Sequence, residues 1–136
     1  MTVLSREEGK AALGKKRGKG EHNLQSSIMR FLDDALPSSC YAFAVPNGGK
    51  RNAVTGAILK REGVKAGVAD IMILRNPGMC AMIEVKTKEG GLSNSQKLFR
   101  DWCSANGFPY AVVRSLGDVE CALLDWGIPL SMRLSA

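Results

Sequence analysis

The sequence predicts an α/β fold with a central mixed four-stranded sheet flanked by helices, and three observations support this prediction. Two apolar runs rich in β-branched residues, 71–74 and 80–85, flank an Asn-Pro-Gly turn at 76–78, a pattern typical of a β-hairpin. Two further short apolar segments, 41–45 and 109–114, alternate with stretches of helical periodicity. The 136 residues are 45% hydrophobic, which is sufficient for the core of one globular domain.

Composition argues against several classes of protein. No apolar stretch approaches the roughly 18 residues that a membrane-spanning helix requires, and the N-terminus lacks the apolar segment of a signal peptide. We therefore expect a soluble, cytoplasmic protein without membrane association. The cysteines have no C-x-x-C spacing, which favours reduced core thiols over zinc ligands or disulfides. His22 is the single histidine, which argues against histidine-based metal chemistry.

Positive charge is concentrated at the N-terminus. Residues 1–20 hold six basic and two acidic side chains, a net charge of +4 out of +6 for the whole chain. A basic arm that contains glycines can bind phosphate backbones, but a flexible solubilising tail has the same composition. We expect residues 1–20 to form a flexible arm and residues 21–136 to form a single domain.

The first helix is predicted over 21–36, because apolar residues recur there at helical spacing and Pro37 marks the end. Glu21 precedes Leu24 by three positions and Ile28 by seven, which places an acid on the core-facing stripe in the first turn. From there Glu21 could reach a metal ion held elsewhere in the domain. Alternatively, it only interacts favourably with the helix dipole.

A glycine-containing basic loop over 46–51 follows the first predicted strand. Its glycines allow a close approach to phosphate and Lys50 and Arg51 add charge, although an ordinary surface turn has the same composition. A second helix is then predicted from Asn52 to Gly63. Lys60 and Lys65 continue the basic character towards the hairpin.

Two acids are predicted to face each other across the hairpin. If the turn centres on Pro77, antiparallel pairing places Asp70 opposite Glu84, and alternation places Lys86 on the same face as Glu84. Like charges directly opposite repel, so such a pair calls for a compensating cation. The residues therefore suit a metal-dependent phosphodiesterase, in which carboxylates hold Mg²⁺ and a lysine orients water. The alternative is a solvated hairpin with charged strand ends.

A third helix is predicted to begin after Ser93 and to end at Gly107. Gln96 has capping-box spacing from Ser93, but it also lies on the inward-facing stripe near the acids. The following strand, 109–114, is expected to pair in parallel with the previous one through a right-handed helical crossover. A final helix carries Val119, Ala122, Leu123 and Trp126, and the tail over 127–136 could extend a dimer contact.

These motifs, in this order, resemble the PD-(D/E)xK nuclease superfamily and, within it, the VRR-NUC family. The resemblance runs from 21 to 126 and rests on an acid in the first helix, the loop over 46–51, GVAD at 67–70, EVK at 84–86 and Gln96. It implies a restriction-endonuclease-like αβββαβ core with an extra helix between strands one and two. Ala69 stands where the family usually has proline, which removes backbone rigidity but no ligand.

The resemblance also implies roles for individual residues. Asp70, Glu84 and the Val85 carbonyl would bind Mg²⁺ or Mn²⁺, and Glu21 would complete the site. Lys86 would position the nucleophilic water, and Gln96 would contact the scissile region. Asn47 and Arg51 match family positions expected near DNA, and the basic pattern adds Lys50, Lys60 and Lys65.

The function expected from these features is a metal-dependent DNA endonuclease, selective for branched DNA such as Holliday junctions and homodimeric because a junction needs paired incisions. The chain is similar to the stand-alone members found in bacteria and their phages, whose relatives include repair enzymes and junction resolvases. The first alternative is a catalytically weak or inactive nucleic-acid-binding module of the same fold. A third hypothesis is an interaction subunit that avoids nucleic acid.

Overall fold

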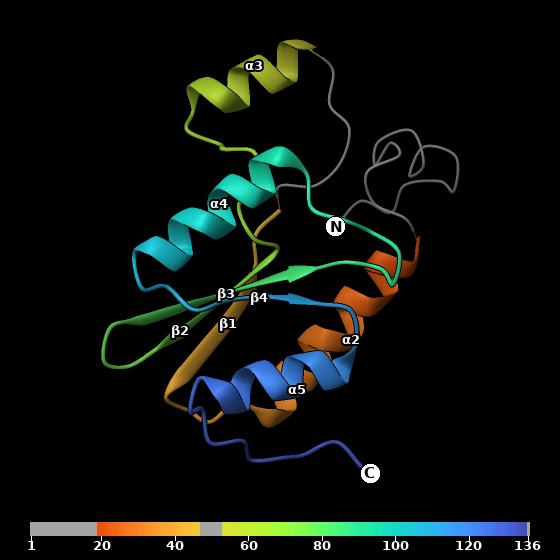
Figure 1. Ribbon diagram of the computed structural model, residues 1–136, viewed down its shortest axis with the longest axis vertical. Helices are drawn as coiled ribbons and strands as arrows, with labels where there is room; N and C mark the ends of the chain where they lie inside the picture. Colours follow the sequence, from red (N-terminus) through yellow and green to blue (C-terminus); the bar gives the residue numbers. More distant parts are fainter. Residues whose placement is uncertain (1–18, 47–52, 136) are drawn as a thin grey trace.

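A four-stranded sheet with helices on both faces forms the centre of the molecule (Figure 1). The computed structural model describes residues 19–46 and 53–135. The elements follow the chain in the order α2 (Lys19–Ala35), β1 (Cys40–Ala44), α3 (Ala53–Arg61), β2 (Ile71–Arg75), β3 (Met79–Val85), α4 (Asn94–Ala105), β4 (Tyr110–Val113) and α5 (Leu116–Asp125). The basic arm, apart from Lys19 and Gly20, lies outside the described residues.

The sheet is mixed, as the sequence predicts. Its strand order is β1-β2-β3-β4, in which the first three strands are antiparallel and β4 runs parallel to β3. The helical crossover through α4 explains the parallel pair, because a tight turn cannot join parallel strands. The extra helix predicted between the first two strands is α3.

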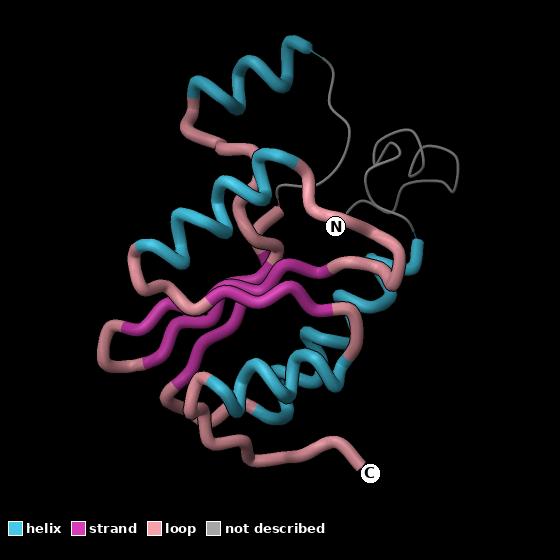
Figure 2. Tube along the Cα trace, viewed as in Figure 1, coloured by secondary structure: helices cyan, strands magenta, loops and turns pink. Residues whose placement is uncertain are grey.

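The hairpin register agrees with a turn centred on Pro77. Ile71 pairs with Ile83 and Arg75 pairs with Met79. One step beyond the Ile71 pair, this register places Asp70 opposite Glu84. The register thus agrees with the predicted pairing of the two acids, at the end of the hairpin away from its turn. Figure 2 shows the hairpin and its turn.

Alternation along the strands separates two apolar layers. The face covered by α2 and α5 holds the larger buried cluster, which includes Ile28, Leu32, Ile71, Ile73, Ala81, Ile83, Val85, Val113, Val119 and Leu123. The opposite face, under α4, holds a smaller cluster around Ala69, Met82 and Cys103. Figure 1 shows α4 on one side of the sheet and the α2–α5 pair on the other.

Residues 127–135 pack against their own domain. Ile128 is fully buried in the larger cluster, and the Ser131 N–H donates to the Ala35 carbonyl at 2.8 Å. The Leu134 N–H donates to the Glu120 carboxylate at 2.6 Å. This segment thus closes the end of the α2–α5 layer, and a dimer contact through it stays a prediction.

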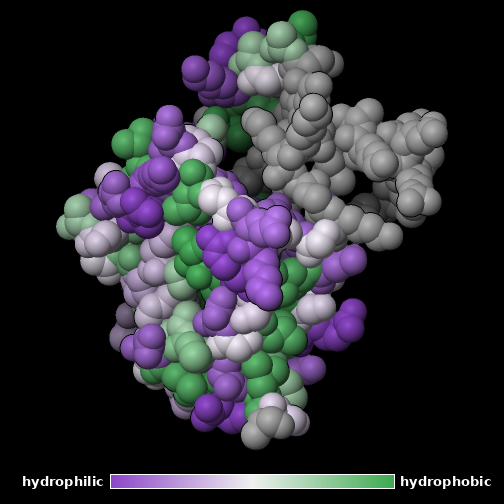
Figure 3. Space-filling view, turned by 45° about the vertical axis from the view of Figure 1, so that its right-hand side comes forward, coloured by the Kyte–Doolittle hydropathy of each residue, from purple (hydrophilic) through white to green (hydrophobic). Residues whose placement is uncertain are grey.

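Helix α3 stands apart from the sheet. None of its residues is buried, Val54 is 70% exposed, and no Cα atom of α3 lies within 8 Å of one in another described helix or strand. In the space-filling view the top of the molecule, formed by α3, carries hydrophilic and apolar side chains next to each other (Figure 3). None of the helices in the described ranges has the length and apolar character needed to span a bilayer.

Candidate active site

Asp70 directly precedes β2, at the end of the hairpin away from its turn. Its backbone carbonyl accepts a hydrogen bond from the Val45 N–H at 2.7 Å, so the end of β1 holds it from one side. Its side-chain Oδ2 accepts from the Val85 N–H at 2.8 Å, across the hairpin. The carboxylate thus takes the place of a backbone acceptor just before β2 begins, and these bonds orient a side chain that is only 7% exposed.

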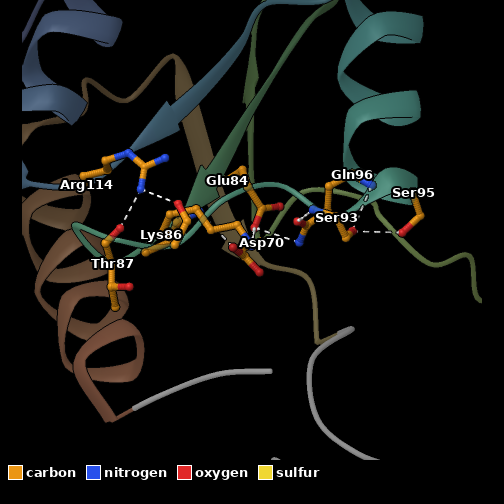
Figure 4. A network of polar contacts seen from close by, with 10 residues as sticks. Asp70, Glu84, Lys86, Thr87, Ser93, Ser95, Gln96 and Arg114 are labelled. Carbon is orange, nitrogen blue, oxygen red and sulfur yellow. Dashed lines mark hydrogen bonds and ion pairs between the residues drawn. The ribbon is translucent and has the colours of Figure 1, made fainter. Parts of the chain in front are cut away.

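Glu84 is the most deeply buried acid of the group, with 2% of its surface exposed. Its Oε2 accepts a hydrogen bond from Gln96 Nε2 at 3.3 Å and lies 3.9 Å from Lys86 Nζ (Figure 4). A buried carboxylate is costly unless donors and an opposite charge surround it. Lys86 supplies the compensating positive charge that the facing acids require.

Gln96 forms the predicted cap and also contacts Glu84. Its side-chain Oε1 accepts from the Ser93 N–H at 2.8 Å, and its own N–H donates to Ser93 Oγ at 3.2 Å, which completes the predicted capping box. Its Nε2 remains available for Glu84 because the amide oxygen and nitrogen point to different partners. The N-terminus of α4 is therefore joined directly to the acid pair.

Glu21 is buried in the first turn of α2 and lies beside the lysine. A Cβ added at Gly90 would be 3.6 Å from both Glu21 Oε1 and Lys86 Cδ, so these groups meet at this glycine. In the described part of the chain, however, no three acidic, histidine or cysteine side chains are arranged to hold a metal ion. Glu21 and the acid pair thus do not form a preassembled three-acid cluster.

Gly67 brings the segment before Asp70 against α4. Its φ of +89° lies in the left-handed region, and an added Cβ would collide with the Ser95 carbonyl. Close contact at this point requires glycine. Ala69, where the VRR-NUC resemblance leads one to expect proline, is buried against Met82 and Cys103. The smaller side chain is therefore accommodated in a packed layer.

A hollow of about 1050 Å³ opens over these residues. All five predicted catalytic residues line it, as do the two predicted DNA-binding lysines of the α3 region: Glu21, Asp70, Glu84, Lys86, Gln96, Lys60 and Lys65. Asn47, Lys50 and Arg51 lie outside the described residues. The structure therefore places basic side chains on the α3 side of the acid pair.

Two neighbouring residues were not anticipated from the sequence. Burial, followed by the nearby charge of Glu84, raises the pKa of Tyr110 above its usual value. Arg114 Nη1 donates to the carbonyls of Thr87 and Gly90, each at 2.6 Å. Neither has a local sequence signal, because Tyr110 lies in β4 and Arg114 directly follows it, both beyond the helical crossover.

The donor set fits a hard divalent cation. Asp70 and Glu84 supply carboxylate oxygens at the same edge of the sheet. Successive residues of β3 direct their backbone groups alternately towards β4 and towards the opposite side. The Val85 N–H bonds to Asp70, so both backbone groups of Val85, including its carbonyl, face the Asp70 side. Carboxylate and carbonyl oxygens suit Mg²⁺ or Mn²⁺, with water completing the coordination shell.

Comparison with known proteins identifies the family of this chain. The model of the VRR-NUC domain matches residues 24–116, which is more than half of the chain. The chain belongs to the VRR-NUC family. This is a nuclease family, so the fold of the domain is of nuclease type.

Solved VRR-NUC structures share the architecture. A VRR-NUC domain protein is 19% identical, with a TM-score of 0.60 over 81% of this chain and 89% of that one. A second VRR-NUC domain is 17% identical, with a TM-score of 0.53 over 79% of this chain and 97% of that one. No curated protein sequence matches this chain. At these identities the likeness concerns the fold.

Proposed function

We propose that this VRR-NUC protein is a cytoplasmic, divalent-metal-dependent DNA endonuclease that is selective for branched DNA. The observation that carries the proposal is the buried Asp70–Glu84 pair, with Lys86 beside it, in a hollow bordered by Lys60 and Lys65. Burying two acids opposite each other costs free energy, and structure alone does not require it. A reaction that needs a metal ion and a phosphate at this edge explains why the acids are there.

Each residue of the site has its own role in the proposed reaction. Asp70, Glu84 and the Val85 carbonyl hold Mg²⁺ or Mn²⁺, which when bound polarises the phosphate and lowers the pKa of a coordinated water. Lys86 Nζ orients the attacking water and offsets the negative charge that develops on the phosphate. Gln96 holds Glu84 in place and contacts the scissile region, while Glu21 completes the site beside Lys86.

The preference for branched DNA and the homodimer belong to the same proposal. One domain presents one such hollow, and symmetrical cutting of a four-way junction needs two sites related by a two-fold axis. Lys60 and Lys65 bind backbone phosphates next to the acid pair. From the sequence, Asn47, Lys50 and Arg51 are also expected to bind DNA.

The test is cleavage of a labelled four-way junction beside linear duplex and single-stranded DNA, in Mg²⁺, Mn²⁺ or chelator. Metal-dependent cutting concentrated at the junction supports the whole proposal. Equal cutting of all substrates retains the nuclease and overturns the preference for branched DNA. Light scattering at the assay concentration checks the dimer, and a strict monomer contradicts paired incision.

A second candidate is a nucleic-acid-binding module with weak or no turnover. Ala69 and the absence of a preassembled three-acid cluster among the described residues favour it. Such a module binds DNA equally well in chelator and leaves it intact, with an affinity that falls steeply with salt. Binding without cleavage in every metal would therefore select this candidate.

A further inference from the structure

Arg114 joins the two ends of a turn that follows the catalytic strand. Its Nη1 donates to the carbonyls of Thr87 and Gly90, each at 2.6 Å, while the Gly90 N–H donates to the Thr87 carbonyl at 3.2 Å (Figure 4). Charge-assisted bonds to two carbonyls from one nitrogen define the conformation of this turn. Lys86 directly precedes the turn.

The turn lies next to two residues of the candidate site. A Cβ on Gly90 would lie 3.6 Å from Glu21 Oε1 and 3.6 Å from Lys86 Cδ, so displacement of Gly90 would change the space available to both side chains. The Lys86 N–H donates to the Val113 carbonyl at 3.0 Å. The backbone of Lys86 is therefore held by β4, and the two ends of the 87–90 turn are held by the arginine that follows β4.

Arg114 is itself held in place at the start of α5. Its N–H donates to Asp118 Oδ2 at 2.8 Å, and the Asp118 N–H donates to the N-cap Ser115 Oγ at 3.1 Å. These bonds fix the backbone from which the arginine extends. Its carbonyl partners lie 24 and 27 positions earlier in the chain.

We infer that Arg114 is a positioning residue of this nuclease: it holds the 87–90 turn so that Lys86 and Glu21 keep the geometry needed for hydrolysis. The inference rests on the proposed function. Arg114 acts through the turn and does not touch the reacting phosphate. The competing role is a direct phosphate contact, because Arg114 also lines a surface hollow with Lys97 and Arg100.

The experiment compares Arg114→Gln and Arg114→Lys with the matched control Arg133→Gln, whose arginine pairs with Glu120 in the C-terminal segment. Steady-state cleavage gives kcat and KM separately. Hydrogen exchange of the metal-free, DNA-free protein reports the protection of the Gly90 amide. Thermal unfolding shows whether each variant is folded at the assay temperature.

Loss of a residue that orients an active-site group reduces activity by about ten- to hundredfold, and we expect a loss of this size in kcat for Arg114→Gln with KM little changed. The Gly90 amide should exchange faster in Arg114→Gln than in wild type and in Arg133→Gln. Arg114→Lys, which keeps the charge and one donor nitrogen, should recover part of both properties. If Arg114→Gln is unfolded, the same two comparisons are made with Arg114→Lys.

Two results would overturn the inference. One is unchanged Gly90 exchange. The other is a loss that appears only in KM and is restored fully by lysine, which identifies a phosphate contact. If the wild-type protein cuts no DNA, the proposed function fails, while faster exchange at Gly90 still establishes that Arg114 holds the turn.

Discussion

The two faces of the β2–β3 hairpin differ sharply although their residues alternate along the same strands. On one face Ile71, Ile73, Ala81, Ile83 and Val85 are at most 1% exposed and pack against α2 and α5. On the other face the open end of the hairpin carries Asp70, Glu84 and Lys86, with α4 covering only part of the layer. One face is closed and apolar, and the other opens into a charged hollow.

This difference shows how a small domain can tolerate buried charge. Each large side chain fully buried on the closed face contributes about 1.5–3 kcal/mol, which offsets the desolvation of the acids on the other face. Because the two sets of residues share one backbone, packing of the closed face also holds the strands that position the acids. Stability and chemistry should therefore be separable by substitution on one face at a time.

The largest effect is expected for Lys86→Ala on the open face. Removal of the cation that stabilises developing charge should reduce kcat by about 10²–10³-fold, while DNA binding changes little. Cleavage kinetics and a binding assay in chelator measure the two separately. Lys88→Ala, which removes an exposed lysine two positions later, is the control. Turnover retained in Lys86→Ala would disprove the role assigned to Lys86.

Ile83→Ala tests the closed face. Truncation of a fully buried isoleucine should lower the free energy of unfolding by about 2–5 kcal/mol, measured by urea denaturation. Leu74→Ala, on the open face where the side chain is 43% exposed, should cost clearly less. Equal losses in the free energy of unfolding for the two variants would contradict the conclusion that the closed face provides most of the stability.

Gly67→Ala should reduce both stability and activity, each to a smaller degree than the variants above. The positive φ should cost about 1–3 kcal/mol, and contact with the Ser95 carbonyl should displace the start of α4 and so reduce kcat. Gly63→Ala is matched, because Gly63 also has positive φ but has no neighbour within 4 Å. Both variants should lose stability, but only Gly67→Ala should lose activity. Equal activity in the two would show that this contact does not position Gln96.

The smallest effect is expected for the titration of Glu120, whose carboxylate binds the C-terminal segment. The Leu134 N–H, followed by Arg133, holds the pKa of Glu120 below its usual value of 4.5. A depressed folded-state pKa stabilises the fold above the unfolded value, and this contribution is lost as pH falls through the folded value. The Leu134 amide shift, followed by NMR, should therefore titrate below pH 4.5. A midpoint at or above the usual value would contradict this bond.

Much of the site was predictable because it depends on local spacing. The turn centred on Pro77 sets the hairpin register, and the register sets Asp70 opposite Glu84. The three-residue spacing of Ser93 and Gln96 predicts the cap that brings the amide towards Glu84. In both cases the interaction is set by residues that are close in sequence, at the hairpin turn in the first case and in the first turn of α4 in the second.

The rest depends on how distant elements dock. The apolar spacing of Val54 and Ile58 predicts a helix, but not that α3 would lie away from the sheet with both side chains exposed. An arginine that donates to backbone carbonyls has no partner motif in sequence, because every residue carries a carbonyl. The contacts of Arg114 therefore required the structure.

The order in which the chain can assemble follows from the pairing of Asp70 with Glu84. One short turn brings these acids together, so their contact is local and has a small loop-closure cost. Glu21 belongs to the first described helix, and Arg114 lies beyond α4 and β4 in the chain, so their contacts close longer loops. A partly folded chain can thus hold the two acids without the neighbours that complete their surroundings. Hydrolytic competence should appear last during folding, together with the pairing of the final strand.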